Sequence, residues 1–212
     1  MIQRLVGSEM CIRDSIDSIS PFQDQIEAII LPKTQSFDFL ATLAPMIDFK
    51  NKLVPLIETS RAIETVTQIA AFKDVVGLFF GAADASASLG CKLAWEPLLY
   101  ARHRVVLAAS MFNLFTIDAP YFYIDKMAGL KEEAEAVKNL GFTGKAAIHP
   151  DQIDYINEAF SPSAEEKAEA KKVLEEYQKS GGGAIKVDGQ MIDEPIAEAM
   201  RLKITLGEEE KK

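Results

Sequence analysis

Short apolar runs alternate with longer amphipathic segments through most of the chain. The apolar runs have the length of buried strands, and they lie at residues 28–31, 53–58, 75–84, 115–118 and 145–149. Apolar positions recur at helical spacing between them, at residues 37–48, 61–72, 96–112 and 130–140, and Pro150 begins a further helix. Five strand–helix units in a row predict an α/β fold with a parallel sheet and right-handed crossovers.

The C-terminal part of the chain follows a different pattern. Ser163 and Glu166 have the spacing of a capping box, which predicts a charged helix that runs to about residue 178. Three consecutive glycines at 181–183 end this helix and suit a hinge. The segment after them predicts a hairpin that turns at Asp188-Gly189 and is followed by a terminal helix.

The first fifteen residues show neither a strand period nor a helix period. Residues 6–14 (VGSEMCIRD) resemble the in-frame translation of a transposase adapter used in sequencing-library preparation. A signal peptide is the alternative, but charged residues interrupt the stretch and leave no apolar segment of sufficient length. We therefore treat residues 1–15 as an adapter-derived scar, and we expect the natural protein to have further sequence in its place.

The composition is typical of a globular protein. Of the 212 residues, 48% are hydrophobic and 26% are charged, and the formal net charge is −9. A negative surface repels nucleic acid and anionic membranes, and no apolar run approaches the roughly 20 residues of a membrane span. Cys11 lies in the scar, which leaves Cys91 without a disulfide partner and favours a cytoplasmic location.

Two acidic residues, Glu58 and Asp84, end apolar runs and precede helix-like segments. In a parallel α/β sheet, the carboxyl ends of the strands gather at one rim, where ligands bind. Two carboxylates at this rim offer the oxygen ligands that a partly hydrated Mg²⁺ prefers. Each acid could instead cap the helix that follows it, and because most capping acids hold no metal, spacing alone favours capping.

Other charged residues carry less specific signals. Glu132, Glu133 and Glu135 have the spacing of a solvated helix face. Gly144-Lys145 lacks both the upstream glycine and the following hydroxyl residue of a P-loop, which excludes that kind of phosphate site.

Several short motifs occur in an order that resembles one known family. They are residues 31–33 (LPK), 55–59 (PLIET), 81–84 (GAAD), 99–102 (LYAR), 147–150 (AIHP) and 188–195 (DGQMIDEP). Each motif is weak by itself, but together they resemble the citrate lyase beta-chain-like family, which includes malyl-CoA lyases and related acyl-CoA aldolases. The resemblance covers residues 28–206.

This resemblance implies a TIM (β/α)8 barrel of which the chain holds only the later strands, with roughly the first three absent. By this comparison, residues 16–160 form the incomplete barrel, residues 161–207 form a C-terminal helical and hairpin lid, and residues 208–212 form a charged tail. In the family, an arginine on an early strand holds the carboxylate of the keto acid. We therefore expect the chain as given to be inactive and its full-length parent to be an enzyme.

The resemblance also implies a reaction. Family members use Mg²⁺ to cleave a hydroxy-acyl thioester of coenzyme A or of acyl carrier protein, of the malyl or citryl type, into a keto acid and an acetyl thioester. Glu58 and Asp84 match the metal-binding acids of the family. Asp193 matches the aspartate that moves a proton at the methyl carbon of the thioester.

Two of the implied assignments have structural alternatives. Ile148, His149 and Pro150 match a family stretch near the coenzyme A arm, but His149 could equally cap a loop. Asp193 precedes a predicted helix and could cap it. Because the C-terminal segment of relatives reaches over a neighbouring subunit's barrel, Asp193 as a proton donor implies a homo-oligomer, either a trimer or a hexamer.

Two other functions stay open beside the lyase. A malyl-CoA thioesterase or a malate-synthase-like enzyme uses the same metal and acid but hydrolyses or condenses its substrate. A non-catalytic subunit or remnant would only assemble with a complex. Product analysis separates a lyase from a thioesterase, because a lyase yields a keto acid and acetyl-CoA, whereas a thioesterase frees coenzyme A.

Overall fold

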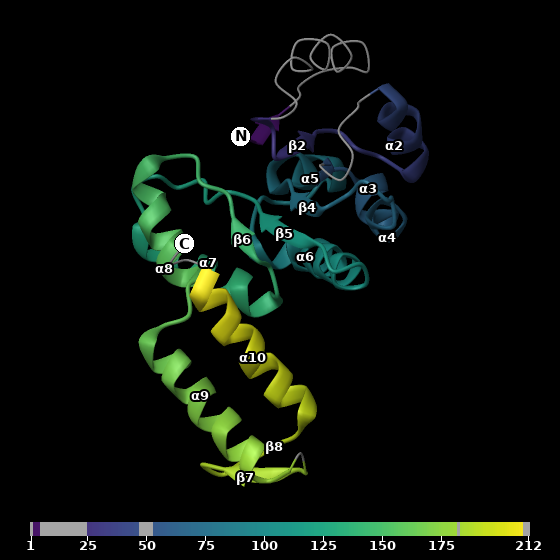
Figure 1. Ribbon diagram of the computed structural model, residues 1–212. Helices are drawn as coiled ribbons and strands as arrows, with labels where there is room; N and C mark the ends of the chain where they lie inside the picture. Colours follow the sequence, from purple (N-terminus) through teal and green to yellow (C-terminus); the bar gives the residue numbers. More distant parts are fainter. Residues whose placement is uncertain (1, 5–24, 47–52, 182, 210–212) are drawn as a thin grey trace. The chain divides into compact units, whose positions relative to one another are not determined.

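A computed structural model describes residues 2–4, 25–46, 53–181 and 183–209. The chain divides into two compact units, Met1–Ile156 and Asn157–Lys212, with the boundary inside helix α8 (Ile153–Phe160). The first unit is α/β, and the described part of the second is helical with a small antiparallel hairpin (Figure 1). Within the described residues, none of the helices has the length and apolar character needed to cross a bilayer.

The described part of the first unit contains a parallel sheet of six strands in the order β1-β2-β3-β4-β5-β6. The strands are β1 (Ile2–Arg4), β2 (Ala28–Leu31), β3 (Leu53–Ile57), β4 (Gly77–Phe80), β5 (Phe115–Asp118) and β6 (Gly144–Lys145). Each strand pairs with the next one in sequence. A doubly wound sheet reverses its strand order at a switch point, whereas a TIM barrel does not. The strand order is therefore that of a barrel segment.

Helices connect the strands from β2 onward. They are α2 (Phe37–Leu43) with the 3-10 turn η2 (Ala44–Met46), α3 (Ser60–Glu64), α4 (Val66–Ala70), α5 (Ala82–Leu89), α6 (Trp95–Ser110), α7 (Met127–Leu140) and the 3-10 turn η3 (Pro150–Gln152), which leads into α8. Helix α6 packs against α4 and against strands β4 and β5. The sequence predicted these helices except α5, which falls where a strand end and a loop were expected. The end of the helix expected at 37–48 lies outside the described residues.

One predicted helix is broken. The helix expected at 61–72 is interrupted at Thr65, which separates α3 from α4. The Thr65 hydroxyl is placed to donate to the carbonyls of both Arg61 and Gln35, at 2.9 and 3.1 Å. A threonine hydroxyl that bonds to backbone carbonyls competes with the regular helical pattern, which accounts for the break.

Strands β2, β3 and β4 are largely buried on both faces. Alternate positions of β2, β3 and β4 are fully buried together with helix residues, and this set comprises Ile29, Leu31, Leu53, Ile57, Leu78, Phe80, Leu40, Ile69 and Leu98. The intervening positions form a second cluster, which comprises Ala28, Ile30, Val54 and Leu56 with Val76 and Phe79 packed against them. Burial on both faces explains why these runs are continuously apolar rather than alternating.

The five predicted strands are confirmed, but some boundaries differ. The run at residues 75–84 contains a strand only from Gly77 to Phe80, and helix α5 already begins at Ala82. The last strand is likewise shorter than the expected segment 145–149. Ile2–Arg4 forms β1 beside β2, although no strand was expected in that segment. Pairing through backbone groups at an open sheet edge does not require an apolar pattern.

The second unit is a helical hairpin closed by a small antiparallel sheet (Figure 1). Helix α9 (Ala164–Lys179) and helix α10 (Glu194–Glu209) pack side by side, and strands β7 (Ile185–Val187) and β8 (Gln190–Ile192) join them. The predicted capping box at Ser163 and Glu166 is present. The turn between the strands has positive φ at Asp188 (47°) and Gly189 (90°), as the predicted two-residue hairpin turn requires.

Candidate metal and substrate site

Three chemically important residues follow three neighbouring strands at their carboxyl ends. Lys33 follows β2, Glu58 follows β3, and Asp84 lies in the first turn of α5, directly after β4. Because these strands are parallel neighbours, their carboxyl ends form one rim. The prediction that Glu58 and Asp84 gather at this rim is therefore consistent with the sheet order.

The Glu58 side chain is held in one orientation. Glu58 is 2% exposed, and its Oε1 accepts a 2.7 Å hydrogen bond from the backbone N–H of Lys33. Lys33 has a positive φ of 55°, a conformation that few non-glycine residues adopt. On the other side of the carboxylate, a methyl group added at Gly81 would lie 2.7 Å from Glu58 Cβ and 3.1 Å from Oε2. The glycine at 81 therefore leaves the space that the carboxylate occupies.

Neither acid is an N-cap, so the capping alternative is wrong for both. Thr59 is the N-cap of α3, and its hydroxyl oxygen accepts a 3.1 Å hydrogen bond from the Ala62 N–H. Gly81 is the N-cap residue of α5, and Asp84 lies three positions further along. The Asp84 carboxylate is instead 3.6 Å from the Lys33 ammonium, an exposed pair that contributes little to stability.

The two carboxylates affect one another electrostatically. Burial raises the pKa of Glu58 above its ordinary value, the Lys33 amide lowers it, and the nearby negative charge of Asp84 raises it again. The Asp84 side chain is also close enough to hydrogen-bond with Glu58 when one of the two is protonated. A divalent cation between the two groups would relieve their repulsion.

This donor set fits magnesium. Carboxylate oxygens are hard ligands, and Mg²⁺ is commonly bound by one or two carboxylates while it keeps several water molecules. Among the residues that the structure describes, no group of three or more His, Cys, Asp and Glu side chains could hold a metal. Glu58 and Asp84 therefore suit a partly hydrated Mg²⁺ rather than a closed structural metal site.

The predicted coenzyme-binding stretch follows β6. His149 is the N-cap of η3, and its Nδ1 accepts a 3.3 Å hydrogen bond from the Asp151 N–H. The capping alternative for His149 is thus present in the structure, and a role toward coenzyme A stays a prediction. Ile148 has an exposed side chain, while its backbone N–H donates to Gln152 Oε1 at 3.0 Å. Pro150 is the first residue of η3.

Asp193 lies in the second unit, immediately before α10. Its Oδ1 accepts a 3.3 Å hydrogen bond from the Ile196 N–H, and its carbonyl accepts a 2.9 Å bond from the Ala197 N–H. Asp193 therefore has the contacts of a helix N-cap. Its predicted catalytic role stays a prediction, because capping uses one carboxylate oxygen and leaves the other available.

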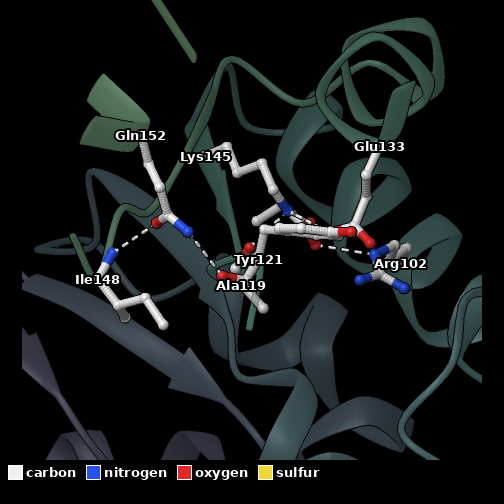
Figure 2. Close-up of polar contacts among 8 residues, drawn as sticks. Arg102, Ala119, Tyr121, Glu133, Lys145, Ile148 and Gln152 are labelled. Carbon is white, nitrogen blue, oxygen red and sulfur yellow. Dashed lines mark hydrogen bonds and ion pairs between the residues drawn. The ribbon is translucent and has the colours of Figure 1, made fainter. Parts of the chain in front are cut away.

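A second polar cluster lies at the carboxyl ends of β5 and β6, and the sequence analysis did not predict it (Figure 2). Asp118, at the end of β5, accepts from Arg102 Nε through Oδ1 at 2.8 Å and from Lys145 Nζ through Oδ2 at 2.9 Å. The same Lys145 ammonium donates to Glu133 Oε1 and to the Ala119 carbonyl, each at 2.7 Å. The prediction that Glu133 lies on a solvated helix face is therefore wrong.

Gln152 extends this cluster to the neighbouring loop. Its side-chain amide is fully buried, accepts from the Ile148 N–H and donates to the Tyr121 carbonyl at 2.9 Å (Figure 2). It thereby joins the loop after β6 to the loop after β5. The sequence contains one indication of this cluster. Arg102 lies four residues after Leu98 and therefore on the apolar stripe of α6. A charged residue on a buried stripe indicates a buried ion pair.

Comparison with known proteins establishes the family. A family model described as HpcH/HpaI aldolase/citrate lyase matches residues 8–150. The chain belongs to this family. The resemblance inferred from the motifs is thereby confirmed, and so is the expectation of a lyase-type enzyme family.

Named relatives agree with this assignment. The chain is 31% identical to the mitochondrial citramalyl-CoA lyase of Homo sapiens, over 94% of this chain and 68% of the relative. It is 34% identical to the citrate lyase subunit beta-like protein of Mycobacterium tuberculosis, over 79% of this chain and 62% of the relative. The chain thus spans about two thirds of the length of these relatives.

Solved structures confirm the fold. The CitE protein of Mycobacterium tuberculosis, in complex with magnesium, acetoacetate and coenzyme A, is 28% identical, with a TM-score of 0.83 over 98% of this chain and 78% of that one. RipC from Yersinia pestis is 37% identical, with a TM-score of 0.72 over 78% of each chain. The first unit of this chain is therefore part of a TIM barrel.

Proposed function

We propose that this chain carries the metal site of a Mg²⁺-dependent carbon–carbon lyase that acts on a hydroxy-acyl thioester. The observation that carries this proposal is the pair formed by Glu58, directly after β3, and Asp84, in the first turn of the helix after β4, with a raised pKa at Glu58. Family membership supports it, and the mycobacterial CitE structure contains magnesium together with coenzyme A. The proposed products are a keto acid and an acetyl thioester.

Carbon–carbon cleavage places negative charge on two groups in turn, first on the substrate oxygen and then on the enolate of the acetyl thioester. The substrate hydroxyl loses its proton and becomes the carbonyl of the keto acid as the carbon–carbon bond breaks. The electron pair of that bond forms the enolate of the acetyl thioester, which then takes a proton on carbon to become a methyl group. A Mg²⁺ ion, when bound, supplies a Lewis acid for the oxygens of the keto acid.

Residues of this chain are proposed to hold the metal, to deliver the proton and to bind the arm of the thioester carrier. Glu58, fixed by the Lys33 amide, and Asp84 would hold the metal. Asp193 would deliver the proton to the enolate carbon as a general acid, in a homo-oligomeric protein. Ile148, His149 and Pro150 would lie along the coenzyme A arm or along the corresponding arm of an acyl carrier protein.

Metal binding is the direct test, because it depends on residues that the structure describes. Binding of Mn²⁺, a spectroscopically visible substitute for Mg²⁺, should be saturable and should weaken by at least about tenfold in Glu58→Gln and in Asp84→Asn. Asp74→Asn is the control, since Asp74 precedes β4 and so lies at the amino end of the strands, opposite the rim. Equal Mn²⁺ binding in all four proteins would refute the metal site.

The products of a thioester assay then separate the alternative functions. A keto acid with acetyl-CoA indicates a lyase, free coenzyme A with intact hydroxy acid indicates a thioesterase, and the reverse condensation indicates a malate-synthase-like enzyme. Metal binding that leaves every thioester unchanged in the complete protein would favour a non-catalytic subunit.

A further inference from the structure

Lys33 occupies a backbone position that rarely holds a lysine. It follows Pro32 in the turn after β2, and its φ is 55°. A turn position with positive φ directly after a proline is usually filled by glycine or asparagine. A larger side chain held in this conformation strains the backbone, and residues strained in this way gather at functional sites. The lysine therefore calls for an explanation beyond the turn itself.

The backbone contacts of this turn do not require a lysine. The N–H of Lys33 donates to Glu58 Oε1 at 2.7 Å, and the Thr34 hydroxyl donates to the Leu31 carbonyl at 3.0 Å. A glycine at position 33 would have the same N–H and would adopt a positive φ without strain. The ammonium group is the part of Lys33 that a glycine could not supply.

This ammonium group is loosely held at the rim. The Lys33 side chain is 60% exposed, and its Nζ lies 3.6 Å from Oδ1 of Asp84, whose side chain is 51% exposed. A separation of 3.6 Å is an ion pair but is too long for a hydrogen bond. Because lysine carries its charge and three donors on a flexible four-carbon stem, the ammonium can turn from Asp84 to another anion nearby.

The charges at the rim indicate what that anion gains. Glu58, Asp84 and Lys33 act on one another electrostatically, and when all three are ionised their charges sum to −1. A divalent cation held by the two acids would change this sum to +1, whereas without Lys33 it would be zero. Lys33 therefore gives the metal-loaded rim a net positive charge, which attracts an anionic ligand.

The proposed reaction supplies such an anion, because its keto acid carries a carboxylate. We propose that Lys33 is a substrate-binding residue of this site, whose ammonium leaves Asp84 when a metal is held there and pairs with the carboxylate of the keto acid. Charge-assisted hydrogen bonds between an ammonium and a carboxylate are among the stronger ones in proteins, and such a bond would orient the keto acid at the metal. This assignment rests on the proposed function and adds a residue to it.

Two affinities that move in opposite directions test the role of Lys33. In the full chain, Lys33→Gln should tighten Mn²⁺ binding by up to about fivefold, because it removes a competitor for Asp84. The same variant, loaded with Mn²⁺, should bind pyruvate about tenfold more weakly, as measured by the relaxation of the pyruvate methyl protons. Lys33→Arg keeps the positive charge and should retain most of the pyruvate affinity.

Lys73→Gln is the matched control. Lys73 is exposed and precedes β4, so it lies at the amino end of the strands, opposite the rim. Its substitution changes the net charge of the chain equally and should leave the Kd of pyruvate unchanged. Equal pyruvate affinities in the Lys33→Gln and Lys73→Gln variants would overturn the proposal. Weaker binding of both Mn²⁺ and pyruvate in Lys33→Gln would also overturn it, because Lys33 would then only support the structure of the site.

A metal-free comparison separates this proposal from the metal site. Asp84→Asn releases the Lys33 ammonium without any metal. The metal-free Asp84→Asn variant should bind pyruvate about tenfold more tightly than a variant that combines Asp84→Asn with Lys33→Gln. If Mn²⁺ does not bind the wild-type chain, the proposed function fails, and this pair of variants still decides the role of Lys33. Equal pyruvate binding in the pair, or none in either variant, would refute that role.

Discussion

The backbone amide of Lys33 donates a 2.7 Å hydrogen bond to the carboxylate of Glu58, 25 residues further along the chain. This bond uses an N–H just past the end of β2, in a residue whose φ of 55° is left-handed. It engages Oε1 of Glu58, while Oε2 lies toward Gly81. The orientation of the acid thus depends on backbone geometry, and this dependence can be tested.

Gly81→Ala should displace Glu58. The added methyl group would lie 2.7 Å from Glu58 Cβ, which is closer than real Cβ contacts permit. Overpacking of this kind costs about 1–3 kcal/mol of stability, and Mn²⁺ affinity should fall as the carboxylate moves. Urea unfolding and Mn²⁺ titration measure the two effects. Gly183→Ala is the control, because a methyl group there would meet nothing within 4 Å.

Lys33→Gln should strengthen metal binding rather than weaken it. The Lys33 ammonium is 3.6 Å from Asp84 Oδ1 and competes with a cation for that oxygen. The substitution keeps the backbone N–H that holds Glu58, and loss of an exposed ion pair should change stability by less than about 1 kcal/mol. Mn²⁺ titration at low salt is the measurement. A weaker Kd would mean that Lys33 supports the metal instead of competing with it.

Lys145→Met should strongly destabilise the first unit. It removes one partner from a buried cluster and leaves Asp118 and Glu133 undercompensated, a change that typically costs about 3–5 kcal/mol. Lys172→Met is the matched control, because Lys172 forms a 2.6 Å pair with Asp188 but both side chains are exposed. That variant should lose far less stability than Lys145→Met, because water screens an exposed pair. Chemical unfolding of both variants makes the comparison, and equal losses would contradict the role of burial.

Asp193→Asn should separate capping from catalysis. Asparagine caps a helix about as well as aspartate, so the hydrogen bond from Ile196 and the stability should be retained. An amide cannot donate the acid proton, so the lyase turnover of the complete protein should fall by about 10²–10⁴-fold. Asp193→Ala would lose both properties. Turnover unchanged in Asp193→Asn would leave Asp193 with its capping role alone.

Local patterns in the sequence predicted most of the elements correctly. The capping box at Ser163 and Glu166 and the turn at Asp188-Gly189 depend on residues within a few positions of one another, and both are present. The end of β3 before Glu58 follows from the same kind of pattern, whereas Asp84 lies in α5 and not at the end of the expected strand. The helix start at Ala82 was missed because an apolar run of small residues does not distinguish a buried strand from a buried helix.

Contacts between distant elements were not predictable in the same way. Glu133 looks solvent-facing by its helical position, yet Lys145 of β6 reaches it across the cluster. The backbone N–H of Lys33 makes the contact that orients Glu58, and a local sequence pattern does not indicate it. Both contacts depend on which strands become neighbours, and that is a property of the assembled sheet.

Gln152 couples the loop after β5 to the loop after β6. Its one buried amide joins the Ile148 N–H to the Tyr121 carbonyl, with 26 residues of chain between the two loop ends. We expect these loops to shift together, so that a molecule pressing on Ile148 would also displace the backbone at Tyr121. Selection acting on either loop would then constrain the other, and an insertion tolerated in one would require a compensating change in its neighbour.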